Sequence, residues 1–141
     1  MAAEMKAVAH PCRDCPYSRE CRPGALGGSN PAVYIGQAHG PFTLPCHKHC
    51  NFDDPDWKAK ALDTPQCAGA AIFRTHIGAA DRMPAAMPRM PANSTVFASE
   101  AEFVSHHTGT PLEKVKAWLT PAVIESMTMD QLLKAARKEL P

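Results

Sequence analysis

The chain has 141 residues, which is long enough for one compact domain, or for a small metal-organised region followed by a short helical one. Its formal net charge is +1. The length excludes two large cores. The sequence has no polybasic tail, so its charge does not suggest nucleic acid as a partner. No apolar run approaches the length that crosses a membrane, and residues 1–10 lack the apolar segment of a secretion signal. We therefore expect a cytoplasmic protein.

The first predicted segment, residues 10–29, is an irregular loop that carries Cys12, Cys15 and Cys21. The chain contains 14 prolines, and they interrupt residues 11–91 so often that long helices or a continuous sheet are not expected there. Something other than core burial must stabilise this region. A bound metal can do so, because ligands that meet only in the folded chain turn metal-binding energy into folding energy.

A short helix is predicted after this loop. Asn30 and the proline that follows it are typical of a helix start, so the helix is expected to run through about Ala38 and to end at Gly40. A brief strand is expected at 42–44, and it leads to Cys46.

A second helix is predicted at about 65–77, where a Thr-Pro pair opens it and Gly78 stops it. Cys67 then lies in the first turn of this helix. Exposed amides and the positive end of the helix dipole favour the thiolate at such a position, and the thiolate is the form that binds metal.

Three regions are predicted along the chain: a cysteine-rich, metal-binding region at 1–81, a Pro/Met-rich linker or surface strap at 82–95, and a helical region at 96–141. Apolar residues of the last region recur near helical spacing and can share one small core. The expected fold is therefore small and mostly α-helical, with an irregular N-terminal half and at most a minor strand pair. Helix starts are predicted at Ser99 with Glu102, at Thr110 and Pro111 with Glu113, at Thr120 and Pro121, and at Thr128 with Gln131.

Six cysteines supply the candidate metal ligands, because in a reducing compartment clustered thiols more often bind metal than form disulfides. Cys12 and Cys15 form a Cys-x-x-Cys pair, whose two sulfurs can reach the same ion from one tight turn. Cys46 is favoured because it follows the predicted strand, and Cys67 because of its helix-start position. The reserve ligands are Cys21, Cys50, His47 and His49.

Both a [4Fe–4S] cluster and a zinc ion suit four thiolates. The cluster is narrowly favoured, because Pro16 follows Cys15 as in some cluster motifs and no second Cys-x-x-Cys completes a paired zinc ribbon. Zinc is the alternative. Two of the six cysteines are expected to be small buried groups rather than ligands. A nucleophilic Cys46 activated by an adjacent histidine is disfavoured, because neighbours in sequence rarely present that geometry.

The cysteine pattern resembles an uncharacterised family of cysteine-rich proteins of phages, prophages and bacteria. The shared motifs are Cys-x-x-Cys-Pro with an aromatic residue, Pro-Gly-x-Leu-Gly, Cys-His, and Gln-Cys-Ala-Gly-Ala. They stand here at 12–17, 23–27, 46–47 and 66–70, and residues 96–107 are similar as well. The resemblance covers about residues 10–107. It implies four recurrent cysteines, those at 12, 15, 46 and 67, and it implies no activity.

A looser likeness is to the WhiB-type iron–sulfur regulators, whose Cys-x-x-Cys-x5-Cys spacing is reproduced by Cys12, Cys15 and Cys21. Those proteins carry their other cysteine upstream, where this chain has none. This likeness would make Cys21 a ligand in place of one of the downstream cysteines.

The favoured function is that of a regulatory or macromolecule-binding metal protein. Residues 100–119 can be interpreted as a helix-turn-helix with Lys114 and Lys116 on a DNA-facing surface, although an ordinary helical hairpin is the simpler interpretation. The alternatives are an electron carrier, a metal-dependent enzyme, and an inhibitor of a host factor. Enzymatic activity is less expected, because paired carboxylates, a phosphate-binding loop and a catalytic triad are all missing from the sequence. A protein or DNA partner is expected, rather than a membrane or a small-molecule substrate.

Overall fold

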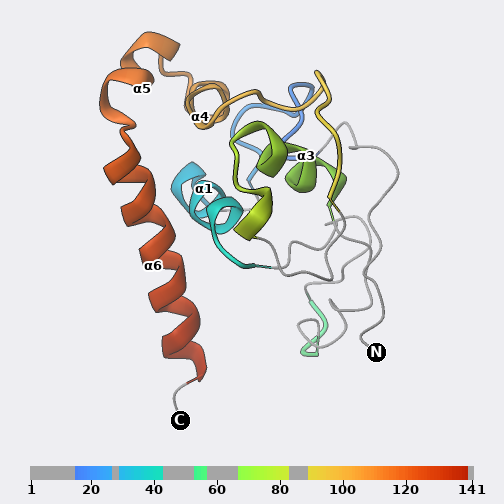
Figure 1. The fold of residues 1–141 in the computed structure, drawn as a ribbon, viewed down its shortest axis with the longest axis vertical. Coiled ribbons are helices and arrows are strands. Elements are labelled where there is room, and N and C mark those ends of the chain that lie inside the picture. The colour runs from blue at the N-terminus through green and yellow to red at the C-terminus, as the bar shows by residue number, and fades with distance from the viewer. Residues whose placement is uncertain (1–14, 27–28, 43–52, 57–66, 83–88, 140–141) are drawn as a thin grey trace.

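A computed structural model of the chain describes residues 15–26, 29–42, 53–56, 67–82 and 89–139. The predicted mostly-α fold is confirmed, and within the described ranges strand pairing is limited to one isolated bridge, between Ser18 and Val96. In Figure 1, α1 lies between α3 and the long α6, and α4 and α5 lead to the start of α6. The elements are α1 (Pro31–His39), α3 (Ala68–His76), the 3-10 turn η1 (Ala80–Arg82), α4 (Glu100–Thr108), α5 (Leu112–Trp118) and α6 (Pro121–Glu139).

The first predicted helix is confirmed as α1. The Asn30 side chain accepts a hydrogen bond from the Val33 amide at 3.2 Å, and the helix ends at its C-cap Gly40. Helix α6 packs against α1 where α1 carries Gly36. A Cβ at Gly36 would collide with the Met127 carbonyl oxygen, so the absence of a side chain allows the two backbones to approach. The strand predicted at 42–44 lies mostly outside the described residues.

The second predicted helix is present as α3, and Gly78 follows its end with a φ of +73°. The predicted start at residue 65 was wrong by three places, because α3 begins at Ala68. Cys67 is therefore its N-cap and does not belong to its first turn. Its backbone is extended (φ −66°, ψ 116°), which turns the sulfur back towards the first amides of the helix. The residues immediately before Cys67 lie outside the described ranges.

Two of the four helix starts predicted near the C-terminus are confirmed. The Ser99 hydroxyl accepts a hydrogen bond from the Glu102 amide at 3.2 Å and begins α4, which ends at Gly109 in the left-handed conformation. The Thr120 hydroxyl accepts a hydrogen bond from the Val123 amide at 3.3 Å and begins α6.

Two predicted caps were wrong. Helix α5 is present, but its N-cap is Pro111, whose side chain has no hydrogen-bonding group to cap it. Thr128 begins no helix. It lies inside α6, and its hydroxyl donates to the Ile124 carbonyl at 3.1 Å. Neither glycine nor proline occurs between Thr128 and the end of α6, so the helix continues through this position.

An aromatic cluster forms the centre of the core. The ring centroid of Phe103 lies 5.4 Å from that of Tyr17, 5.6 Å from that of Phe73 and 5.7 Å from that of Phe97. Described residues on both sides of the predicted linker at 82–95 therefore share one core. Other members of this core are Cys15, Leu26, Ile35, Ala38, Ala70, Ile72, Val96, Val104, Val115 and Leu119. None of the described helices combines the length and the apolar character needed to cross a membrane.

Candidate metal centre

The candidate centre is a pair of thiols contributed by two distant segments. Cys15 lies in a turn, where its carbonyl oxygen accepts a hydrogen bond from the Ser18 amide at 2.9 Å, and Cys67 caps α3. Their Sγ atoms are 3.3 Å apart across 52 residues of sequence, and neither forms a disulfide. Cys15 is 1% exposed, whereas Cys67 is only partly buried. The fold thus brings together two of the four ligands that the sequence favours.

Gly69 makes room for this pair. A Cβ built on Gly69 would collide with the Cys15 sulfur. It would also lie 3.3 Å from the Cβ of Tyr17. The three residues after Cys67 are Ala, Gly and Ala, and all are buried. This first turn of α3 therefore presents backbone and little else to the sulfur atoms.

The surroundings of Cys67 favour a negatively charged sulfur. The hydrogen bond with Cys15 lowers the pKa of Cys67; burial opposes this, and the amides of Ala70 and Gly69 and the positive charge of Arg74 lower it further. The Ala70 amide lies 3.4 Å from the sulfur. The net lowering of the pKa favours the thiolate, which is the form that binds a metal.

Arg74 is a buried cation that the sequence reasoning missed. The side chain is 0% exposed, and it donates hydrogen bonds to four backbone carbonyls, from Nε to Ala38 (2.9 Å) and from Nη2 to Gln37 (3.0 Å), Gly40 (3.0 Å) and Phe42 (2.8 Å). Most of these carbonyls belong to the C-terminal end of α1, the negative end of the helix dipole. An arginine in the last turn of a helix ordinarily suggests a solvated side chain, so only the contact between α3 and α1 could reveal this role.

Tyr17 lies beside the thiol pair in the buried core. Burial raises the pKa of its hydroxyl well above the usual value, and negative charge on Cys67 and Cys15 adds to that effect. The hydroxyl is therefore neutral, and it donates to the Tyr34 carbonyl at 3.3 Å. The Tyr34 hydroxyl in turn donates to the Leu26 carbonyl at 2.9 Å. Tyr17 and Cys15 belong to the same buried core, and Tyr34 and Cys67 pack against it.

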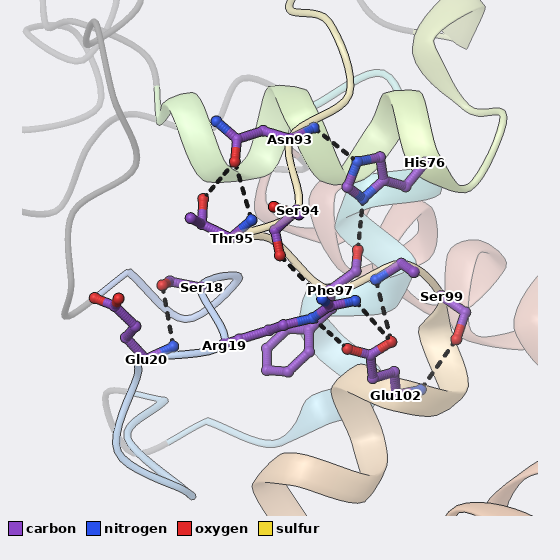
Figure 2. A network of polar contacts seen from close by, with 11 residues as sticks. Ser18, Arg19, Glu20, His76, Asn93, Ser94, Thr95, Phe97, Ser99 and Glu102 are labelled. Carbon is purple, nitrogen blue, oxygen red and sulfur yellow. Dashed lines mark hydrogen bonds and ion pairs between the residues drawn. The ribbon is translucent and has the colours of Figure 1, made fainter.

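A polar network holds the Cys15 turn against α4 (Figure 2). The Arg19 guanidinium contacts both carboxylate oxygens of Glu102 and donates to the Ser94 carbonyl at 2.9 Å. Nearby, His76 accepts from the Asn93 amide at 3.1 Å through Nε2, so its Nδ1 donates to the Phe97 carbonyl at 2.8 Å. Because these side chains are occupied by internal bonds, they position the loop and offer no ligand to a metal.

Of the other predicted ligands, Cys21 is the one that lies in the described ranges. Cys21 is 2% exposed, and its thiol donates to the Arg22 carbonyl at 3.5 Å. Within the ranges that the structure describes, no three His, Cys, Asp or Glu side chains gather closely enough to hold an ion. Any further ligands of the pair must therefore come from other residues. The predicted ligands outside the described ranges are Cys12 and Cys46, with the reserves Cys50, His47 and His49.

The spacing of the pair is nearer to that of two ligands on one ion than to that of two cysteines on a cluster. Two thiolates on a tetrahedral zinc lie about 3.8 Å apart, given Zn–S bonds of about 2.3 Å. The 3.3 Å between the sulfurs of Cys15 and Cys67 is close to this value. In a [4Fe–4S] cluster each cysteine binds its own iron, so the cysteine sulfurs stand farther apart than they do on one ion. Comparison of the chain with protein-family models, curated proteins and solved structures gives no significant match.

Lys114 and Lys116, the candidate DNA-facing residues, are exposed on α5. The Lys116 ammonium lies 3.6 Å from the carboxylate of Glu113 on the same helix. Helix α5 has seven residues, a length of about 10 Å, and is joined to α4 through Gly109. A glycine C-cap followed by a short helix is common to a helical hairpin and a helix-turn-helix, so DNA binding by the two lysines stays a prediction.

Proposed function

We propose that the chain is a small cytoplasmic metal protein in which Cys15 and Cys67 bind the same ion and so join the N-terminal loop to α3. The observation that carries the proposal is the contact between the two sulfurs, 3.3 Å apart and 52 residues apart in sequence. Cys12 and Cys46 are the residues proposed to complete the ligand set, because four thiolates close a structural site.

The surroundings of the pair support a metal-binding role over simple packing. Two buried cysteines can act as small apolar groups, and then nothing near them needs to favour negative charge. Here the Ala70 amide points at the Cys67 sulfur, and the charge of Arg74 favours the thiolate. Gly69 leaves the space that the Cys15 sulfur fills. These three features act on the same two atoms.

Zinc is the ion that we propose, in preference to the [4Fe–4S] cluster favoured by the sequence pattern. The short sulfur–sulfur distance is the reason, since 3.3 Å is nearer to the separation of two ligands on one tetrahedral ion than to the wider spacing of cysteines around a cluster. Zinc has no redox chemistry of its own. The centre would then act as a structural link, which gives less support to electron transfer or catalysis.

A macromolecule-binding role is proposed for the helical region. Four large apolar side chains are exposed on α5 and α6: Leu112 (36%), Trp118 (46%), Met129 (49%) and Leu133 (51%). Exposed tryptophan and methionine are enriched where proteins contact one another. A protein partner is therefore better supported than DNA. Whether the partner is a regulated protein or an inhibited host factor is a question for capture experiments.

The test is metal analysis of anaerobically purified protein, together with its visible absorption spectrum. We expect about one zinc per chain and no visible absorption in the wild type. Cys67→Ser and Cys15→Ser are expected to lose the metal, while Cys21→Ser, a matched change of a buried thiol, retains it. A brown protein would support the cluster instead. Metal-free protein, or equal loss of metal in all three variants, would contradict the assigned pair.

A further inference from the structure

The two thiols are close enough to react with each other. Their sulfurs are 3.3 Å apart, whereas the sulfurs of a disulfide are about 2.0 Å apart, so closure needs a relative movement of about 1.3 Å. The backbone at Gly69 leaves the Cys15 sulfur unobstructed. The segments that carry the two residues are held in place independently, Cys15 by its turn and Cys67 by α3. Oxidation therefore requires little change in the fold.

The environments of the two sulfurs differ in a way that orders the steps. Cys15 is 1% exposed, while Cys67 is partly exposed and lies at the end of α3. A small oxidant from solvent therefore meets Cys67 first. The first-turn amides that face this sulfur also stabilise negative charge as it develops on the reacting group. Cys15, already in contact, is placed to react second.

We propose that Cys15 and Cys67 are an oxidation site. A hydroperoxide oxidises their two thiols to a disulfide, and the bound metal is then released. The Cys67 sulfur attacks one oxygen of the peroxide, the O–O bond breaks, and the leaving alkoxide or hydroxide takes up a proton. This gives a sulfenic acid on Cys67. The Cys15 sulfur then attacks the Cys67 sulfur, the S–S bond forms, and the S–O bond breaks with loss of water. Two electrons pass from the two thiols to one peroxide.

The metal part of this inference rests on the proposed function. A disulfide removes two thiolates from the ligand set, and the two remaining ligands hold an ion much more weakly, so the ion is released. A dithiol reductant restores both thiols and the site with them. The centre would then be a link between the N-terminal loop and α3 that changes from metal-bound to disulfide-bonded under peroxide.

The sequence makes the test direct. Trypsin cleaves after Lys6, Arg13, Arg19, Lys60 and Arg74, so Cys12, Cys15 and Cys67 fall in three separate peptides: 7–13, 14–19 and 61–74. The purified protein is treated with hydrogen peroxide, its remaining thiols are blocked, and the digest is searched for cross-linked peptides by mass spectrometry. Released zinc is measured in the same samples with a chromogenic chelator. Cys15→Ser is examined with a dione reagent that labels sulfenic acid, and Cys21→Ser is the matched control.

The expected product links peptide 14–19 to peptide 61–74, with one zinc released per cross-link and full reversal by a dithiol. Cys15→Ser should accumulate label on Cys67, and Cys21→Ser should behave as the wild type. If the protein is isolated without metal but forms this cross-link, the proposed function fails and the oxidation site stands. A cross-link between 7–13 and 14–19 instead, cross-linking without release of a bound metal, or resistance to peroxide while other thiols oxidise would overturn the inference.

Discussion

The sulfur of Cys15 occupies the space that a side chain at Gly69 would take. In a helix alanine is more favourable than glycine by about 1 kcal/mol, so a glycine in the first turn of α3 has an intrinsic cost. The thiol pair explains why glycine stands there, because with a Cβ at this position the Cys15 sulfur would have to move from its present place.

Gly69→Ala is therefore expected to weaken the centre. The new methyl group would displace the Cys15 sulfur from Cys67, so we expect metal content to fall at least tenfold while the helical circular dichroism is retained. Metal analysis and peroxide cross-linking are the measurements. Gly36→Ala is the control, because it introduces the same methyl group away from the thiols. Full metal content in Gly69→Ala would show that the two sulfurs need not meet.

Gly36→Ala should instead weaken the packing of α6 against α1. A Cβ at this position would collide with the Met127 carbonyl and would lie 2.8 Å from Cγ of Gln131, both on the facing helix. Overpacking of this kind costs about 1–3 kcal/mol. We expect a lower free energy of unfolding in urea and faster amide exchange in α6 than in α3. Unchanged protection of α6 would contradict the close approach of α1 and α6.

Among the charged residues, substitution of Arg74 is expected to lower the free energy of unfolding most. Arg74→Met would leave four carbonyls without this donor, and its bonds to two of them, Ala38 and Gly40, are buried. Each unsatisfied buried group costs about 1–3 kcal/mol, so we expect a loss of about 3 kcal/mol or more. Arg74→Lys keeps the charge but not the planar fork, and should recover only part of that loss. Urea unfolding of both variants is the measurement. Equal stability of Met and wild type would mean that the four bonds contribute little.

The same comparison separates charge from architecture at the thiols. If the positive charge matters to Cys67, Arg74→Lys should bind zinc more tightly than Arg74→Met does. Competition against a chelator of known affinity gives the ratio. Identical affinities would leave Arg74 as a brace between α1 and α3 alone.

Sequence reasoning succeeded where the signal is local. The caps at Asn30, Ser99 and Thr120 depend on residues close in sequence, and each side chain accepts the expected hydrogen bond from an amide three positions later. Thr128 has the same pattern but lies inside α6, because burial of one face of a longer helix outweighs a local cap.

The candidate site was predictable only in part, for the same reason. The residue types at Cys15 and Cys67 indicated metal chemistry, but no spacing rule says that two cysteines 52 positions apart will touch. Arg74 gave no signal, since its partners are backbone carbonyls of another helix, which every sequence supplies. Long-range contacts made by the main chain are invisible to motif analysis.

His107 should make stability depend on pH. Its Nδ1 accepts a hydrogen bond from the Gly24 amide at 3.0 Å, so the proton of the neutral ring is on Nε2 and is donated to the Pro16 carbonyl at 2.8 Å. Protonation of Nδ1 would break the bond to Gly24. Burial lowers the pKa of His107, the hydrogen bond to Pro16 opposes this, and the neighbouring His106 lowers the pKa further.

The sign of this effect follows from proton linkage. The unfolded state has the ordinary histidine pKa of about 6.5 and binds the proton first, so stability rises with pH in this range. The contribution of His107 is fully present above pH 6.5 and is lost as the pH falls through the lowered folded-state pKa. We therefore expect the urea midpoint of the wild type to fall between pH 7.5 and pH 5 by more than that of His107→Gln, whose amide keeps a donor and an acceptor without titrating in this range. Parallel curves for the two proteins would show that the ring is protonated equally in the folded and unfolded chains, which the bond from the Gly24 amide to Nδ1 forbids.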